Sequence, residues 1–172
     1  MGGRTKDPTY YRLGDHTETL QLDFDPSKIT YQKLLDIFWS THNGCAQPYS
    51  RQYKSAVFYQ NDAQKKLAQE SRAREAAKKG KAVTTEILPL GTFYLAEEYH
   101  QKYFLRQSSP LLREFQAMYS DAKSFQASTA VARVNGYLGG HGSEAELRAD
   151  IGRLGLSPRG QEALLRAWKE SR

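Results

Sequence analysis

One carboxylate in this sequence stands among apolar side chains in a pattern suited to proton transfer. Polar and apolar residues alternate over residues 15–24, the period-2 pattern of a β-strand with one buried face. Glu18 falls on the apolar face, which also holds Leu20, Leu22 and Phe24. Because burial disfavours a charged carboxylate, a buried Glu18 would retain a proton that it can donate. Pairing with a Lys or Arg, or a wet position at the strand end, is the alternative.

Tyrosine and cysteine side chains supply the other chemically useful groups. Tyr10 and Tyr53 carry phenols that could donate hydrogen bonds beside such a carboxyl, although tyrosines in strands more often fill a core. Cys45 is the one cysteine, so an internal disulfide and a cysteine-based zinc site are excluded. It stands in a predicted loop with no evident cation to activate it, which favours an incidental thiol.

No other pattern indicates cofactor or metal chemistry. The histidines are far apart, and the single Glu97-x-x-His100 spacing is half of what a di-iron bundle needs. The sequence contains neither a Gly-rich phosphate loop nor a serine nucleophile elbow. We therefore expect no bound metal and no resident cofactor.

Length and composition limit the class of protein. The chain has 172 residues, a net charge of +6 and enough aromatic residues for a core, which fits one domain or a domain with a small appendage. No run approaches the roughly 20 apolar residues that span a bilayer, and residues 1–8 lack the apolar stretch of a signal peptide. We expect a cytoplasmic protein with no membrane partner.

Basic residues are densest over residues 65–81, where Glu70 and Glu75 interrupt them. On a helix this mixture is typical of a solvated face. Nucleic-acid binding is the alternative, but no recognition module accompanies the charges, so we expect no nucleic-acid partner.

Strands and helices mix in the first part of the chain. Thr30 is placed to cap a helix over residues 31–38, and Asn61 a long helix that Gly80 ends. Strands are predicted over residues 15–24, 53–59 and 83–88. A further helix is predicted to resume near residue 93 and to carry residues 96–103.

From about residue 108 the pattern becomes helical throughout. Apolar spacing predicts a helix over residues 111–118, and Ser143 with Glu146 has the spacing of a capping box. Ser157 followed by Pro158 starts another helix. An α+β core with a helical appendage follows from this order of elements.

Several segments, taken in order, resemble one family, the peptide methionine sulfoxide reductases of type A. The matching runs cover much of residues 2–106: Pro8-Thr9-Tyr10, Gly14-Asp15-His16-Thr17-Glu18, Phe24-Asp25-Pro26, Phe38-Trp39 with His42, Gln52-Tyr53-Lys54-Ser55-Ala56, Thr85-Glu86-Ile87, and residues 96–103. The resemblance implies reduction of the S epimer of methionine sulfoxide, free or in peptides, with a thioredoxin-like thiol reductant and no cofactor. It implies that Glu18 is the acid, and that Tyr10 and Tyr53 hydrogen-bond the sulfoxide oxygen.

The chain also departs from the family pattern. The Gly-Cys-Phe-Trp run that carries the family's nucleophile is absent from these residues, and Met1-Gly2-Gly3 resembles the end of a strand that follows it. Pro48 stands where the family has a loop aspartate. We therefore expect residues 1–107 to form a ferredoxin-like mixed sheet domain lacking its first strand and helix, and residues 108–172 to form a helical extension.

The departures bear on activity. We expect a catalytically impaired chain, in which Cys45 is the one candidate thiol and could serve as a resolving cysteine. The alternative is a non-catalytic module that binds oxidised methionine peptides or a partner protein.

Overall fold

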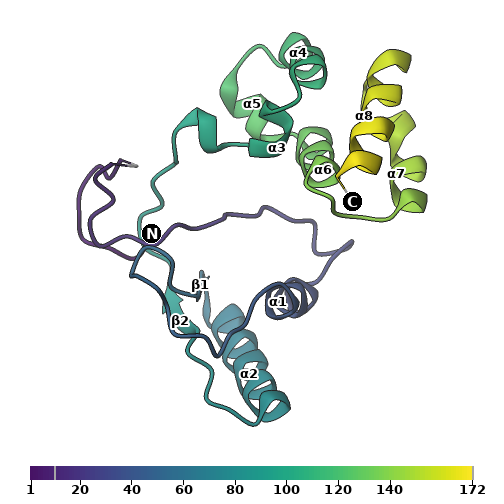
Figure 1. Cartoon of the computed structure of the whole chain (residues 1–172). Coiled ribbons are helices and arrows are strands. Elements are labelled where there is room, and N and C mark those ends of the chain that lie inside the picture. Colours follow the sequence, from purple (N-terminus) through teal and green to yellow (C-terminus); the bar gives the residue numbers. More distant parts are fainter. Residues whose placement is uncertain (10, 172) are drawn as a thin grey trace. The chain divides into compact units, whose positions relative to one another are not determined.

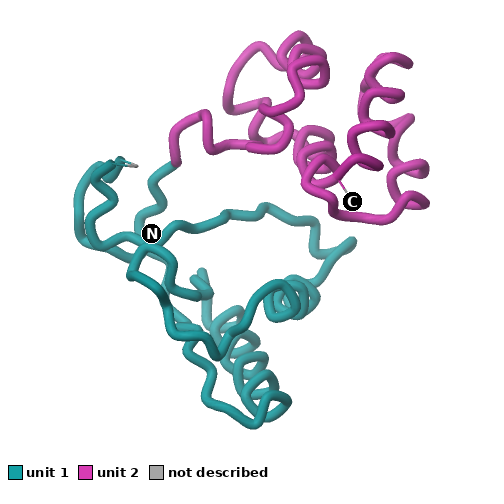
Figure 2. Tube along the Cα trace, in the orientation of Figure 1, with its two compact units in different colours: residues 1–95 teal, residues 96–172 magenta. Residues whose placement is uncertain are grey.

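The computed structural model describes residues 1–9 and 11–171. Tyr10, a predicted site residue, lies outside the described residues. The chain divides into two compact units, residues 1–95 and residues 96 onward (Figure 2). This division falls before the predicted boundary at residue 107, and the assignment of roles to the two parts of the chain remains a prediction.

Unit 1, residues 1–95, is built around a strand–helix–strand crossover. Strand β1 (Ala56–Tyr59) pairs in parallel with β2 (Glu86–Pro89), and helix α2 (Asp62–Lys79) lies between them in the chain (Figure 1). Two parallel strands need such a crossover because the chain must return to the end of the sheet where the first strand began, which a tight turn cannot do. Helix α1 (Tyr31–Ser40) packs against α2.

Local signals in the sequence fix the helix ends of unit 1. The Thr30 side chain accepts a hydrogen bond from the backbone of Lys33, and Asn61 accepts one from Gln64. Helix α2 ends at Gly80, which has the left-handed conformation (φ 60°) that favours glycine. The predicted capping residues of both helices are confirmed.

A small aromatic core joins the two helices. Leu35 and Trp39 of α1 are buried together with Ala68 of α2, and partly buried side chains from both strands pack against them. The Trp39 indole N–H donates to Ser71 Oγ of α2 at 3.0 Å. Gly44 lies so close to the indole that a Cβ there would come within 2.9 Å of the ring, so this loop position requires glycine.

The strand predicted over residues 15–24 is wrong. The described chain has no strand there, and Leu20 and Leu22 are 80% and 57% exposed. Alternation buries one face only where a segment belongs to a sheet, and the described sheet holds β1 and β2 alone. Residues 15–24 therefore alternate in polarity but pair with no strand of the described sheet, so neither face of the segment is covered by a sheet neighbour.

The other expected elements of unit 1 are partly confirmed. The predicted strands at 53–59 and 83–88 appear as the shorter β1 and β2, which form a two-stranded parallel sheet rather than the mixed sheet predicted. Alpha and beta elements occur together, as an α+β class requires. These elements leave residues 91–95 without regular structure.

The helix predicted over residues 93–103 is wrong. A 3₁₀ turn (Glu98–His100) and the short helix α3 (Tyr103–Arg106) take its place. Between them Lys102 adopts a left-handed conformation (φ 55°), which an α-helix cannot continue through.

Unit 2, from residue 96, is all helical. After α3 come α4 (Ser109–Met118), α5 (Ala122–Ala127), α6 (Thr129–Leu138), α7 (Glu144–Asp150) and α8 (Pro158–Glu170). Its own core contains buried residues from every one of these helices, among them Leu105, Phe115, Phe125, Val134, Leu147 and Trp168. The predicted helical character of this part of the chain is confirmed.

The predicted caps of unit 2 are also confirmed. Ser143 and Glu146 form a capping box at α7, in which each side chain binds the other residue's backbone N–H. Ser157 caps α8, whose first residue is Pro158. Glu114 of α4 adds a second contact there, because its carboxylate accepts from the Ser157 backbone N–H (2.8 Å) and hydroxyl (2.7 Å).

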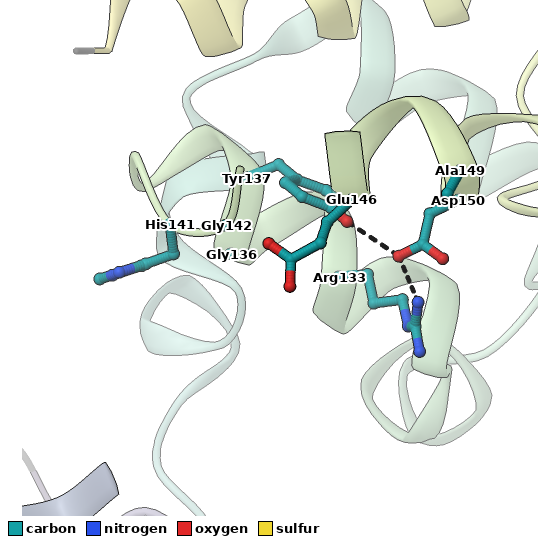
Figure 3. Close-up of a pocket in the computed structure, with 8 residues that line it drawn as sticks. All are labelled: Arg133, Gly136, Tyr137, His141, Gly142, Glu146, Ala149 and Asp150. Atoms are coloured by element: carbon teal, nitrogen blue, oxygen red, sulfur yellow. Dashed lines mark hydrogen bonds and ion pairs between the residues drawn. The ribbon is translucent and has the colours of Figure 1, made fainter. Parts of the chain in front are cut away.

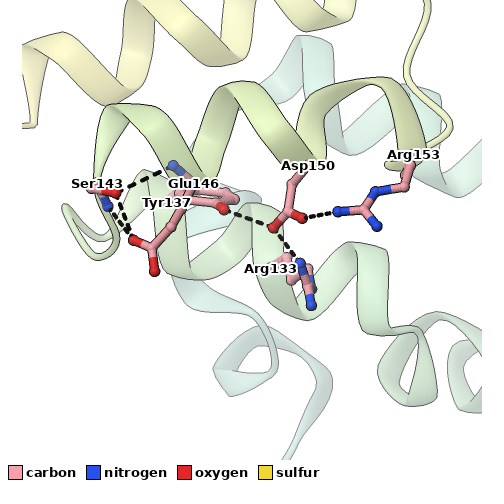
Figure 4. A network of polar contacts seen from close by, with 6 residues as sticks. All are labelled: Arg133, Tyr137, Ser143, Glu146, Asp150 and Arg153. Carbon is pink, nitrogen blue, oxygen red and sulfur yellow. Dashed lines mark hydrogen bonds and ion pairs between the residues drawn. The ribbon is translucent and has the colours of Figure 1, made fainter. Parts of the chain in front are cut away.

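A buried carboxylate connects α6 with α7. Asp150 is 8% exposed and accepts hydrogen bonds from Tyr137, Arg133 and Arg153 (Figure 4). Burial by itself would raise the pKa of Asp150, but the bonds from Tyr137 and Arg133 and the two guanidinium charges outweigh it and lower that pKa. Burial and the neighbouring Asp150 raise the pKa of Tyr137 to about 12.

Replacing Asp150 by Asn is predicted to weaken unit 2 at neutral pH. The expected loss is about 1–3 kcal/mol, because charge-assisted bonds are removed. A carboxyl whose folded pKa is lowered stabilises the fold above its unfolded pKa, and this contribution disappears as the pH falls through the folded value. The difference in the free energy of unfolding between wild type and Asp150→Asn should therefore shrink below about pH 4. Urea unfolding followed by the indole NMR signal of Trp168 measures it.

Glu144→Gln on the same helix is the matched control. Glu144 has 45% of its side-chain surface accessible and pairs with Arg148 one turn away, and such surface pairs contribute little. A gap for Asp150→Asn that stays constant down to pH 3, or one no larger than that of Glu144→Gln, would contradict the role given to the buried carboxylate.

Candidate functional site

Glu18 lies in the solvent and is held by one neighbour. Its backbone N–H donates to the Gln52 carbonyl (3.0 Å), and the Gln52 side-chain amide donates to Glu18 Oε1 (2.7 Å). The prediction of a buried Glu18 is wrong, since the residue is exposed and its partner is a neutral amide. The argument from burial for a proton-bearing carboxyl does not apply in this structure.

Tyr53 directly follows Gln52 in the chain, so the residue with the phenol is next to the residue that binds the Glu18 carboxylate. The Tyr53 side chain is exposed, with 55% of its surface accessible. Sequence reasoning placed Tyr53 near Glu18 and missed Gln52, which makes the actual contact. Its position beside Tyr53 in the same motif was the available signal.

The segment before Glu18 is fixed by the first residues of the chain. The Met1 amino group donates to the Thr17 carbonyl at 2.6 Å, and the Thr17 N–H donates to the Met1 carbonyl at 2.9 Å. His16 is buried and uses both ring nitrogens: Nδ1 accepts from the Gly3 N–H, so Nε2 carries the proton and donates to the Thr5 carbonyl. These contacts, together with those of Asp15, form what we call the N-terminal clamp, residues 1–5 against 15–17.

Asp15 completes the N-terminal clamp. Its carboxylate accepts hydrogen bonds from the backbone N–H groups of Arg4 and Thr5 and from the Thr5 hydroxyl. Bonds from Thr5 and Arg4 hold the pKa of Asp15 well below its usual range. Glu18 therefore extends from a segment that is anchored by both backbone and side chains.

A chain of hydroxyl hydrogen bonds anchors the segment that carries Gln52 and Tyr53. Ser55 Oγ lies 2.9 Å from His42 Nε2 and 2.8 Å from Thr85 Oγ1. His42 Nδ1 lies 2.7 Å from the Phe38 carbonyl. Since a carbonyl only accepts, Nδ1 carries the proton, Nε2 accepts from the Ser55 hydroxyl, and Ser55 in turn accepts from Thr85.

The Thr17 side chain links the two segments of the site. Its hydroxyl donates to the Arg51 carbonyl at 3.0 Å, next to the residue that binds Glu18. The N-terminal clamp thus holds the residues just before Glu18, and the hydroxyl chain holds Ser55, three residues after Gln52. The site consists of a carboxylate, an amide and a phenol at the surface of unit 1.

Cys45 belongs to a loop that is attached to the residues before β2. The Gly44 carbonyl accepts from the Thr84 N–H at 2.9 Å, and the Ala46 carbonyl accepts from the Thr84 hydroxyl at 2.6 Å. Cys45 is partly exposed between these two attachments. Among the described residues, no hydrogen bond joins it to Glu18 or Tyr53.

Residues 1–9 and 11–171 hold no cluster of three or more His, Cys, Asp or Glu side chains arranged to bind a metal ion. In that part of the chain, no helix has the length and apolar character to cross a bilayer.

An open pocket of about 410 Å³ lies in unit 2, and none of the predicted site residues lines it (Figure 3). Arg133, Tyr137, His141, Glu146 and Asp150 contribute its polar lining. Asp150 and Tyr137 already bind each other there, so their polar atoms are engaged in holding α6 to α7. The pocket adds nothing to the candidate site of unit 1.

Comparison with known proteins gives one consistent family. The profile of the peptide methionine sulfoxide reductase family matches residues 1–133. A Drosophila melanogaster peptide methionine sulfoxide reductase is 38% identical over 159 residues, covering 91% of this chain and 63% of its own length. Arabidopsis thaliana peptide methionine sulfoxide reductase A5 is 37% identical over 142 residues, covering 79% and 55%.

The family likeness extends to an archaeal protein and into unit 2. MsrA of Methanothermobacter thermautotrophicus is 42% identical over 114 residues, which are 60% of this chain and 68% of its own. The match to the Drosophila protein covers more residues than the family profile and so reaches further into the helical unit. The chain spans between about half and two thirds of the length of its Drosophila and Arabidopsis relatives.

Ser55→Ala is predicted to destabilise unit 1 because it removes the centre of the hydroxyl chain. His42 and Thr85 would both lose a partner, with an expected loss of about 1–2 kcal/mol. Urea unfolding followed by the indole NMR signal of Trp39 measures it. His42→Phe keeps the ring and removes the same bond, so the double variant should lose less than the sum of the two single variants.

Ser50→Ala is the matched control. Ser50 Oγ is buried without a hydrogen-bond partner in the described residues, so removing it should leave stability unchanged or raise it. Equal losses for Ser50→Ala and Ser55→Ala would show that the hydroxyl chain contributes no stability of its own.

Proposed function

The chain belongs to the peptide methionine sulfoxide reductase family, and we propose on this basis that the Glu18–Gln52–Tyr53 surface of unit 1 receives the sulfoxide group of oxidised methionine, free or in peptides. The observation that supports this most directly is the double attachment of Glu18 to Gln52, beside Tyr53. These groups can hydrogen-bond a sulfoxide oxygen, which is a strong acceptor.

The chemistry assigns a role to each group. A sulfoxide oxygen must be protonated as its bond to sulfur weakens, and a carboxyl group placed at that oxygen can donate the proton. Glu18 is proposed as this acid, and Tyr53, with Tyr10 outside the described residues, as a hydrogen-bond donor to the oxygen. The Gln52 amide suits a carboxyl that changes its protonation state, because an amide can donate to the anion or accept from the acid.

Exposure of Glu18 adds a condition to this proposal. The proton has to be supplied when substrate covers the carboxyl and removes it from water, since desolvation favours the neutral acid. Bound substrate would therefore create the environment that the sequence pattern predicted for the free protein. Donation would then depend on how closely the methionine side chain covers Glu18.

Sulfur chemistry is the second requirement. Reduction needs a thiolate that attacks the sulfoxide sulfur, and these 172 residues hold one thiol, Cys45, which has no hydrogen bond to Glu18 in the described residues. We therefore propose that this chain, acting alone, is impaired in turnover. A thioredoxin-like reductant is the proposed electron source for any turnover, with no bound cofactor.

The first test is turnover of a dabsylated methionine S-sulfoxide peptide, coupled to thioredoxin, thioredoxin reductase and NADPH. The expected rate is at least about 100-fold below that of the Drosophila relative assayed in parallel, a lower bound because removing a nucleophile can cost about a millionfold. Turnover comparable with that relative would contradict the impairment. Loss of that turnover in Cys45→Ser would then identify Cys45 as the working thiol.

The second test concerns binding, which needs no thiol. The single cysteine, which has no hydrogen bond to Glu18 in the described residues, favours a non-catalytic module that recognises oxidised methionine. In that case a sulfoxide peptide should bind more tightly than its thioether form. Glu18→Ala should remove this preference, roughly a tenfold change for one charge-assisted bond.

Glu70→Gln is the control for Glu18→Ala. Glu70 is an exposed carboxylate of α2 with only a 4.0 Å contact to Lys66, so its loss changes the charge without touching the proposed site. Equal affinity of wild type for sulfoxide and thioether peptides, measured by isothermal calorimetry, would exclude the Glu18–Gln52–Tyr53 surface as a sulfoxide site.

A further inference from the structure

Met118 is an exposed methionine whose sulfur takes part in a helix contact. It is the last residue of α4, and 43% of its surface is accessible. Its sulfur lies against Gly155 in the segment before α8, where a Cβ on Gly155 would come within 3.2 Å of it. Gly155 has a left-handed conformation (φ 77°), which favours glycine.

The segment that Met118 contacts leads directly into α8, which begins at Pro158. Leu154 and Leu156, on either side of Gly155, are both buried in the core of unit 2. One helical turn before Met118, Glu114 binds Ser157, the N-cap of α8. Two residues of α4 on one face, Glu114 and Met118, therefore fix residues 155–157.

We propose that Met118 is an oxidation site, and that its sulfoxide loosens the joint between α4 and the start of α8. A thioether packed on a glycine backbone is an apolar contact, and a sulfoxide replaces it with a bulkier, strongly polar group. On the side that faces Gly155 there is little space for an added oxygen, because the sulfur already occupies the volume that a Gly155 side chain would fill.

The oxidant is hydrogen peroxide, and the reaction balances without another reagent. A lone pair of the thioether sulfur attacks one peroxide oxygen, and an S–O bond forms as the O–O bond breaks. The departing hydroxide takes the proton from the transferred oxygen and leaves as water. Sulfur is oxidised by two electrons and peroxide is reduced by two.

The oxidised residue would be methionine sulfoxide in a peptide chain, the class of group that the proposed function of unit 1 recognises. The oxidation site itself does not depend on that function. Repair of Met118 by a second copy of the chain would depend on the proposed function, and the test below does not require such repair.

The test compares full-length wild type with Met118→Leu before and after treatment with hydrogen peroxide. Peptide mass spectrometry should locate the added oxygen on Met118 in the wild type, at a rate within about tenfold of that of a free methionine peptide. Hydrogen exchange should then become faster in residues 155–160 at the start of α8. The unfolding midpoint of unit 2 should fall by roughly 5 °C.

Met118→Leu keeps a similar apolar volume and cannot form a sulfoxide, so peroxide should leave its exchange and its midpoint unchanged. Met118→Gln places a polar group there without oxidant and should reproduce the faster exchange, which keeps the test independent of peroxide damage elsewhere. The proposal is overturned if Met118 resists oxidation at that rate, or if its sulfoxide leaves exchange at residues 155–160 unchanged.

Discussion

The Ser55 hydroxyl joins three segments of unit 1 that are far apart in the sequence. Through it His42, two residues after the end of α1, is linked to Ser55, the residue before β1, and to Thr85, just before β2. A parallel pair of four-residue strands is a small sheet, and short sheets need support from what packs on them. The hydroxyl chain supplies that support at the strand starts, while Trp39 supplies it between the helices.

The same constraint sets the geometry of the candidate site. Gln52 and Tyr53 precede Ser55 by three and two residues, so anchoring Ser55 limits the positions that both can take. Glu18 is fixed separately, by the buried His16 and by the backbone bonds of Thr17. An exposed carboxylate whose backbone is held on both sides loses little further conformational freedom when it binds a ligand.

Local signals predicted much of the fold, whereas signals that depend on distant partners did not. Thr30, Asn61, Ser143 and Ser157 each cap the helix expected, because a cap is decided within three residues. The alternation of residues 15–24 failed, since a strand is completed only by a neighbour that no local pattern specifies. Exposure of Glu18 follows from the same failure, and Gln52 as its partner could not be found without the backbone bond that places it there.

The motif residues divide into two groups, those whose side chains make hydrogen bonds that stabilise the fold and those whose side chains are exposed. Asp15, His16 and Thr17 use their side chains on backbone groups, and Ser55 and Thr85 use theirs on each other. Their match to the family therefore reports a shared fold. Glu18 and Tyr53 differ from these residues: both are exposed, and the Glu18 carboxylate binds only the side-chain amide of Gln52. Polar groups presented in this way carry function more often than stability, and this difference in structural duty is the physical ground for proposing a sulfoxide site there.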